Sequence, residues 1–203
     1  MGDACAWLVA HGTSCAEVAG FIFGVINVYL TVREKIWSWP VGIVNAILSA
    51  VVYYQIGFFS DFGLQFVYMA MSAYGWYHWL HGGAQRAELR VTRTAGSTAS
   101  ILTSAALVGW LIMFNITKDL PRSSLPQFDS LLVALSLVAQ WMMTRKLRET
   151  WLLWIVINIG YVVMQEYRGL HLYAILNGIY GVLAIYGHIE WTRSYARTSH
   201  ASS

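Results

Sequence analysis

Long apolar stretches separated by short polar connections dominate this chain. Seven of these stretches approach the length of about 20 residues that an α-helix needs to cross a bilayer. Polar and basic residues gather between the stretches, and Pro121 and Pro126 mark one connection. The pattern predicts seven transmembrane helices, at residues 16–32, 39–57, 62–81, 99–116, 128–144, 151–167 and 170–191.

The composition excludes an ordinary soluble domain. Hydrophobic residues make up 57% of the chain and charged residues 11%, whereas soluble domains carry about 25% charged residues. Most of the surface therefore does not face water. The predicted fold class is an all-α integral membrane protein with seven transmembrane helices.

Basic residues are distributed unequally between the two sides of the predicted membrane. The connections after the first, third and fifth spans, together with the C-terminal tail, carry ten Arg and Lys residues, and the other side carries three. Basic loops stay in the cytoplasm, so we expect the N-terminus outside and the C-terminus inside. Six acidic residues on the outer side would concentrate a cationic solute, although ordinary loop charges account for them equally well.

The chain also repeats itself. At an offset of about 113 residues Asn45 meets Asn158, and at 112 residues Tyr68 meets Tyr180. Four spans separate the copies, so they enter the membrane in the same direction, and parallel repeats place a substrate site between them near the midplane. The alternative is chance similarity among apolar segments. The expected organisation is an N-terminal segment at 1–15, a three-helix repeat at 16–81, a connector helix at 99–116, a second three-helix repeat at 128–191 and a flexible cytoplasmic tail at 192–203.

Amides and aromatic rings are the candidate binding groups. An amide in hydrocarbon costs several kcal/mol unless it is paired, and its donors and acceptor suit ribose hydroxyls or a carboxamide. A flat cationic ring stacks well on Trp or Tyr. The alternatives are amides that hold helices together, which we favour for Asn27, and rings that only pack. The predicted substrate-binding residues are Asn45, Asn158, Asn177, Gln65, Gln140, Tyr68, Trp76, Tyr180 and Tyr186.

Several segments resemble the PnuC family of nicotinamide riboside transporters. Residues 37–40 (Trp-Ser-Trp-Pro) precede Asn45, and residues 74–79 read Tyr-Gly-Trp-Tyr-His-Trp, with partial counterparts at 151–154 and 186–191. The resemblance implies a SWEET-like fold of three, one and three helices in the bacterial inner membrane. It also implies facilitated uptake of nicotinamide riboside, an NAD precursor, which cytoplasmic phosphorylation traps. Related proteins carry other vitamins, so thiamine, riboflavin or a related nucleoside is the alternative substrate.

Other functions fit the sequence less well. An intramembrane hydrolase needs a nucleophile and a base at one depth, and Ser49, Ser72 and Ser136 have no matching histidine, so we expect no enzyme. His78 and His81 indicate a metal site only weakly, and we expect neither metal nor cofactor. Acidic residues lie near span ends rather than mid-span, which favours facilitated diffusion. The expected partners are the substrate, lipid and further copies of the chain, as a homo-oligomer such as a trimer, without nucleic acid.

Overall fold

The computed structural model describes residues 15–55, 59–118, 125–169 and 171–200. Over these residues the chain forms seven α-helices, one for each predicted span, which confirms the all-α architecture. A short 3-10 helix, η1 (Ala84–Arg86), lies in the connection after the third of them. The α-helices are α2 (Cys15–Val32), α3 (Ser38–Gln55), α4 (Phe59–His81), α5 (Gly96–Thr117), α6 (Pro126–Thr144), α7 (Thr150–Tyr167) and α8 (His171–His200).

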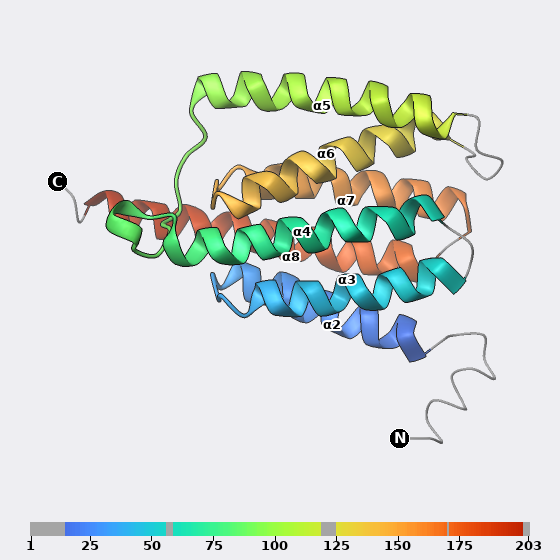
Figure 1. Ribbon diagram of the computed structural model, residues 1–203, viewed down its shortest axis with the longest axis horizontal. Coiled ribbons are helices and arrows are strands. Elements are labelled where there is room, and N and C mark those ends of the chain that lie inside the picture. The colour runs from blue at the N-terminus through green and yellow to red at the C-terminus, as the bar shows by residue number, and fades with distance from the viewer. Residues whose placement is uncertain (1–14, 56–58, 119–124, 170, 201–203) are drawn as a thin grey trace.

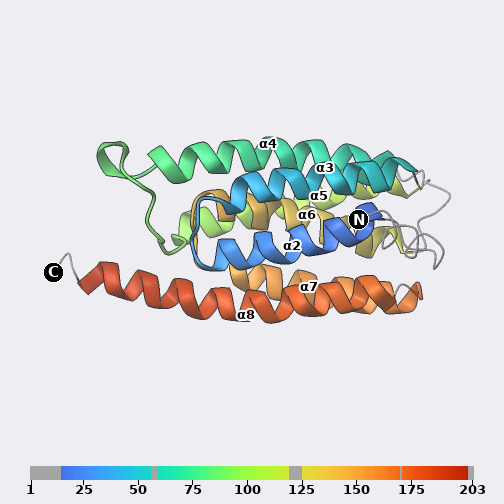
Figure 2. The same cartoon turned by 90° about the horizontal axis from the view of Figure 1, so that it is seen from below.

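Six of the helices close into a ring. Around the ring, α2 contacts α3, α3 contacts α4, α4 contacts α6, α6 contacts α7, α7 contacts α8, and α8 returns to α2. The helices run side by side along the long axis of the molecule (Figures 1 and 2). The ring therefore joins the first three helices, α2–α4, to the last three, α6–α8, through two interfaces, α2 with α8 and α4 with α6.

Helix α5 lies outside the ring, against α6 (Figure 1). Trp110 Nε1 donates to Gln127 O at 3.0 Å, and the Thr117 and Ser130 hydroxyls are 2.8 Å apart. Among the described helices α5 alone qualifies as a membrane span by length and hydropathy, and none of its apolar stretch is buried. Among the ring helices, α2 is apolar over a shorter stretch, Val18–Val32, and others carry polar side chains that lower their hydropathy, whereas α5 needs a surface compatible with lipid on nearly every side.

Two chain reversals share one unusual conformation. Glu34, between α2 and α3, has φ 54°, and Lys146, between α6 and α7, has φ 49°. The two residues are 112 positions apart, and the same separation relates the bond from Lys35 N to Leu30 O to the bond from Leu147 N to Met142 O. A positive φ is uncommon outside glycine, so two such turns align the two halves of the chain at 112 residues.

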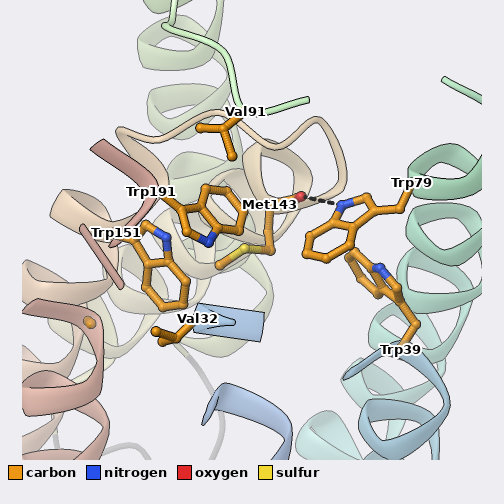
Figure 3. Packing of buried hydrophobic residues seen from close by; sticks show 8 residues of the cluster. Val32, Trp39, Trp79, Val91, Met143, Trp151 and Trp191 are labelled. Atoms are coloured by element: carbon orange, nitrogen blue, oxygen red, sulfur yellow. Dashed lines mark hydrogen bonds between the residues drawn. The ribbon is translucent and has the colours of Figure 1, made fainter. Parts of the chain in front are cut away.

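Four tryptophans meet at one end of the ring, which we name the tryptophan end (Figure 3). The ring centroids of Trp39 and Trp79 are 5.1 Å apart, those of Trp79 and Trp191 are 5.9 Å apart, and those of Trp151 and Trp191 are 5.4 Å apart. The cluster joins the two halves of the molecule because Trp39 and Trp79 come from α3 and α4, and Trp151 and Trp191 from α7 and α8.

Within this cluster the two halves exchange hydrogen bonds. Trp79 Nε1 on α4 donates to Met143 O of α6 at 3.0 Å (Figure 3), and Trp191 Nε1 on α8 donates to Thr31 O of α2 at 3.3 Å. The two donors are 112 positions apart, as are the two acceptors. An indole of each half thus donates to a carbonyl just before the turn of the other half. This reciprocal pattern is expected for two units related by a two-fold axis.

Helix α8 is longer than its predicted span. It continues past Trp191 to His200, so most of the segment 192–203, expected to be a flexible tail, is helical. Tyr195 packs against the core at the tryptophan end, and Arg148 lies over its ring at 4.9 Å. These contacts stabilise the helical conformation of the segment. The predicted N-terminal segment at 1–15 lies outside the described residues except for Cys15.

Candidate functional site

The depth of each candidate residue can be measured from the tryptophan end. A side chain added at Gly75 of α4 would meet the ring of Trp39, and one added at Gly187 of α8 would meet the ring of Trp151. These contacts place the start of α3 level with Gly75 and the start of α7 level with Gly187. With a rise of about 1.5 Å per residue, Asn45 and Asn158 lie about 10 Å further along, near the middle of their helices.

Asn45 and Tyr180 converge over Gly24. A Cβ atom added at Gly24 of α2 would overlap the Tyr180 hydroxyl from α8 and would lie 3.5 Å from Asn45 Oδ1 of α3. Only a residue without a side chain allows the Tyr180 hydroxyl to approach α2 this closely. The contact brings an amide from α3 and a phenol from α8 together against α2 at mid-depth, where they can hydrogen-bond a polar ligand.

Asn158 faces a different neighbour from Asn45. It is 5% exposed, its Nδ2 donates to Trp154 O at 2.7 Å, and its Cβ lies 3.7 Å from a Cβ added at Gly181 of α8. Asn45 and Asn158 are 113 positions apart, one residue out of register with the matched turns. One residue rotates a helix by about 100°, so the two amides share a depth but do not occupy equivalent positions.

Tyr161 is a mid-depth polar residue that the sequence analysis missed. Its hydroxyl hydrogen-bonds with Ser136 of α6, and Tyr68 of α4 and Tyr53 of α3 are among its electrostatic neighbours. Tyr161 follows Asn158 by three positions, so both lie on neighbouring parts of one helix face. That spacing was a usable signal, and the electrostatic neighbours of Tyr161 include Tyr68, a predicted site residue.

Two predicted residues lie further from the tryptophan end. Asn177 Nδ2 donates to Gln165 Oε1 of α7 at 2.9 Å and to Tyr173 O at 2.8 Å. Gln65 of α4 is buried, with 9% of its surface exposed. Each lies about one turn beyond the mid-depth tyrosine of its own helix, so these amides form a second polar layer towards the opposite end.

Three predicted residues belong to the tryptophan end. The Tyr186 hydroxyl accepts from Arg33 Nη1 at 3.4 Å, Gln140 lies one turn before the end of α6, and Trp76 is 39% exposed. Because Trp76 neighbours Gly75, it lies about 9 Å from the level of Asn45. The nine predicted residues therefore occupy three depths, and Asn45, Asn158, Tyr68 and Tyr180 share the middle one.

The histidines considered for metal binding have other neighbours. His78 Nε2 lies 3.1 Å from Arg145 Nη1, and His81 Nδ1 lies 3.1 Å from Tyr77 O. In the part of the chain that the structure describes, no three metal-ligating side chains come together. His78 and Arg145 instead join α4 to the turn after α6.

A carboxylate fastens the α4–α5 connection to the start of α7. Thr94 donates to Glu149 Oε2 through its backbone N at 2.9 Å and its hydroxyl at 2.8 Å, and Arg148 Nε donates to Oε1 at 2.8 Å. Burial raises the pKa of Glu149, but the hydrogen bonds from Arg148 and Thr94 outweigh it and leave the pKa lowered. The ionised form of Glu149 therefore holds the α4–α5 connection against the start of α7.

Two cavities open at the tryptophan end. One of about 330 Å³ is lined by residues of the α4–α5 connection and of α8, together with Glu34 and Lys146. The other, of about 240 Å³, lies between Trp79, Lys35 and the same two residues. Glu34 and Lys146 thus border both cavities, where the two matched turns meet.

Comparison with known proteins identifies relatives along nearly the whole chain. The model of the nicotinamide mononucleotide transporter family matches residues 14–193. The nicotinamide riboside transporter PnuC of Escherichia coli is 28% identical over 209 residues, covering 91% of this chain and 87% of that protein. The riboflavin/roseoflavin transporter RibM of Streptomyces davaonensis is 27% identical over 179 residues, covering 87% and 84%.

A solved structure shares the fold. The crystal structure of the vitamin B3 transporter PnuC superposes with a TM-score of 0.75 at 23% identity, over 97% of this chain and 88% of that one. The likeness extends over the ring and the connector helix together. It confirms the predicted fold, a multi-pass all-α membrane protein.

Proposed function

Because this chain belongs to the nicotinamide mononucleotide transporter family, we propose that it carries nicotinamide riboside across the membrane by facilitated diffusion. The observation that carries the proposal is the family match over residues 14–193, together with relatives named as nicotinamide riboside transporters. The family consists of transporters rather than enzymes, so the polar groups inside the ring are read as binding groups.

The mid-depth residues form the proposed substrate site. The amides of Asn45 and Asn158 would hydrogen-bond the ribose hydroxyls or the carboxamide, and Tyr180 or Tyr68 would stack on the pyridinium ring. We add Tyr161 to this set because its hydroxyl lies beside Ser136 and near Tyr68. The residues at the other two depths would contact the substrate as it enters or leaves the site. They are Trp76, Tyr186, Gln65, Asn177 and Gln140.

Riboflavin is the second candidate substrate. The observation that favours it is the relative named as a riboflavin/roseoflavin transporter, which is 27% identical. Isoalloxazine is also flat and polar at its edges, so amides and tyrosines suit it too. It is neutral, however, and lacks the cation–π attraction that a pyridinium ring gains over an aromatic face.

The remaining parts of the proposal concern coupling and setting. Acidic residues near the span ends support passive equilibration, with cytoplasmic phosphorylation trapping the product. We propose the bacterial inner membrane, with the tryptophan end in the cytoplasm, because the basic turns lie there. We also propose two parallel repeats at 16–81 and 128–191 joined by the connector at 99–116, and a homo-oligomer such as a trimer.

Uptake by purified protein in liposomes tests this function. Radiolabelled nicotinamide riboside should enter until the inner and outer concentrations are equal, and an excess of unlabelled riboside should compete better than riboflavin. Accumulation driven by a proton or sodium gradient would contradict facilitated diffusion. Stronger competition by riboflavin would assign the protein to the second candidate.

A matched pair of variants locates the site in the same assay. Asn45→Leu removes an amide that faces Tyr180, and the loss of one hydrogen bond should weaken binding by about 0.5–1.5 kcal/mol. Asn27→Leu removes an amide packed against Gly42 in the α2–α3 interface and should leave the affinity near that of the parent. Equal affinities for Asn45→Leu and the parent would move the site elsewhere.

A further inference from the structure

Lys146 places its ammonium group in an environment built for a cation. Its Nζ lies 3.1 Å from Glu34 Oε2 and 4.4 Å from the centre of the Trp79 ring. Only 6% of Lys146 is exposed. A carboxylate on one side and an aromatic face on the other is the combination that binds organic cations, because both present negative potential to the same point.

The aromatic side of this environment is rigid. Trp79 is 2% exposed, its Nε1 donates to Met143 O at 3.0 Å, and Trp39 packs edge-on against its ring. The lysine, in contrast, reaches the ring from a turn that belongs to the other half of the chain. The groups that receive the ammonium are therefore held in place, and such preorganisation lowers the cost of binding another cation there.

Space for such a competitor lies beside the lysine. The cavity of about 240 Å³ is bordered by Trp79, Glu34 and Lys146 and carries a second carboxylate, that of Glu88. Drug-sized ligands occupy pockets of about 300–1,000 Å³, so this volume suits a single ring with small substituents. Lys35 also lines the cavity. Once Lys146 moves out, the two carboxylates outnumber the one remaining ammonium group, so the cavity favours a cation over an anion.

We propose that Trp79 and Glu34 form a second cation-binding subsite, at the tryptophan end, and that Lys146 occupies it as a tethered cation. The ligand class is a flat, delocalised organic monocation such as a pyridinium. Displacement of the lysine would free the turn after α6 from the turn after α2, so filling the subsite would loosen the contact that closes this end of the ring.

The link to transport rests on the proposed function. A pyridinium nucleoside that leaves the mid-depth site towards the tryptophan end would meet this subsite next. It would take over the contacts with Glu34 and Trp79 while Lys146 moves into solvent. The subsite would thus exchange one cation for another instead of exposing an unpaired carboxylate.

Titration calorimetry with 1-methylnicotinamide, a pyridinium monocation without ribose, tests the subsite on the full chain. Lys146→Met removes the tethered charge. At probe concentrations that leave Lys146 in place in the parent, we expect the variant to bind one equivalent more of the probe than the parent binds. This difference does not depend on whether the mid-depth site binds the probe. Failure of the parent to transport nicotinamide riboside would refute the proposed function and leave this comparison intact.

Three control variants make the result specific. Lys35→Met removes a lysine of the α2–α3 turn and should add no equivalent, whereas Lys146→Gln should add one even if the methionine variant folds poorly. Lys146→Met combined with Glu34→Gln should lose the added equivalent. Unchanged stoichiometry in both Lys146 variants, or an equal gain in Lys35→Met, would overturn the proposal.

Discussion

At the scale of single residues, the absence of a side chain decides where the polar groups of the candidate site lie. Gly24 is apolar, like most of its helix, and the amino-acid pattern gives it no special role. In the structure it is the surface against which the Tyr180 hydroxyl packs, next to Asn45 Oδ1. A methyl group at this position would compete with the hydroxyl for the same space, so Gly24 positions Tyr180.

We therefore expect Gly24→Ala to weaken substrate binding about tenfold, because overpacking costs about 1–3 kcal/mol and the hydroxyl must move. Gly24→Ala combined with Tyr180→Phe should recover part of this loss, since the overlapping hydroxyl is gone. Calorimetric titration gives both affinities. Gly20→Ala is the control, because nothing lies within 4 Å of a Cβ added there. An affinity unchanged in Gly24→Ala would remove Tyr180 from the site.

The four clustered tryptophans differ in the use of their indole nitrogens. Trp79 and Trp191 donate across the two halves, whereas Nε1 of Trp39 and of Trp151 is buried without a hydrogen-bond partner in the described part of the chain. Trp79→Phe should therefore lower stability by about 0.5–1.5 kcal/mol more than Trp39→Phe, because it removes a hydrogen bond between the two halves, while Lys146 N still donates to the Met143 carbonyl. Thermal unfolding of the detergent-solubilised variants measures the difference, and equal losses would contradict it.

At the scale of elements, the connection between α4 and α5 is part of the folded body. Thr92 accepts from Arg148 N at 3.1 Å and its own N donates to Lys146 O at 3.1 Å, so this segment pairs with the α6–α7 turn. Val91 is 3% exposed and packs in the tryptophan cluster. The connection that leads out to the peripheral helix is thus anchored where the two halves meet.

Glu149 supplies a pH-dependent part of this anchor. Its folded-state pKa is lowered, so its contribution to stability is complete above the unfolded-state pKa, about 4.3, and is lost as the pH falls through the lowered folded value. We expect Glu149→Gln to lower the free energy of unfolding by about 1 kcal/mol at pH 7, which appears as a lower unfolding temperature. In strong acid the variant and the parent should unfold at the same temperature. Glu88→Gln, at an exposed carboxylate, is the control. A deficit that persists unchanged in acid would contradict the ionic role of Glu149.

At the scale of the whole molecule, the ring of six helices is closed mainly at one end. The tryptophan cluster, the exchanged indole bonds and the pair of Lys146 with Glu34 all join the first half to the second there. The basic residues of the α2–α3 and α6–α7 turns lie at the same end. An asymmetric distribution of contacts and charge gives the molecule two different faces, as a transporter requires.

This asymmetry makes a prediction about topology. A fluorescent protein fused after Ser203 should fluoresce, because the tryptophan end and the end of α8 share the basic side, which we propose to be cytoplasmic. Alkaline phosphatase fused at the same point should be inactive. The reverse pair of results would invert the orientation while leaving the helix ring as described.

The sequence by itself determined which segments are helices and how many there are, because the need for about 20 apolar residues in a bilayer is a local property. It also singled out the amides of the spans as candidate binding groups, since amides are rare in apolar spans. Only the tertiary structure decided which of them meet. Residue identity paired Asn45 with Asn158 at an offset of 113 residues, whereas the two turns align at 112 residues. A shift of one residue turns a side chain by about 100° around the helix axis.

Closure of the ring decided the rest. Asn45 and Tyr180 approach one another at Gly24, and Lys146 reaches Trp79, and each contact joins elements that lie far apart in sequence. Such contacts depend on crossing points between helices, and these depend on the shapes of many side chains together. Hydropathy and residue identity along the chain therefore do not predict those crossing points.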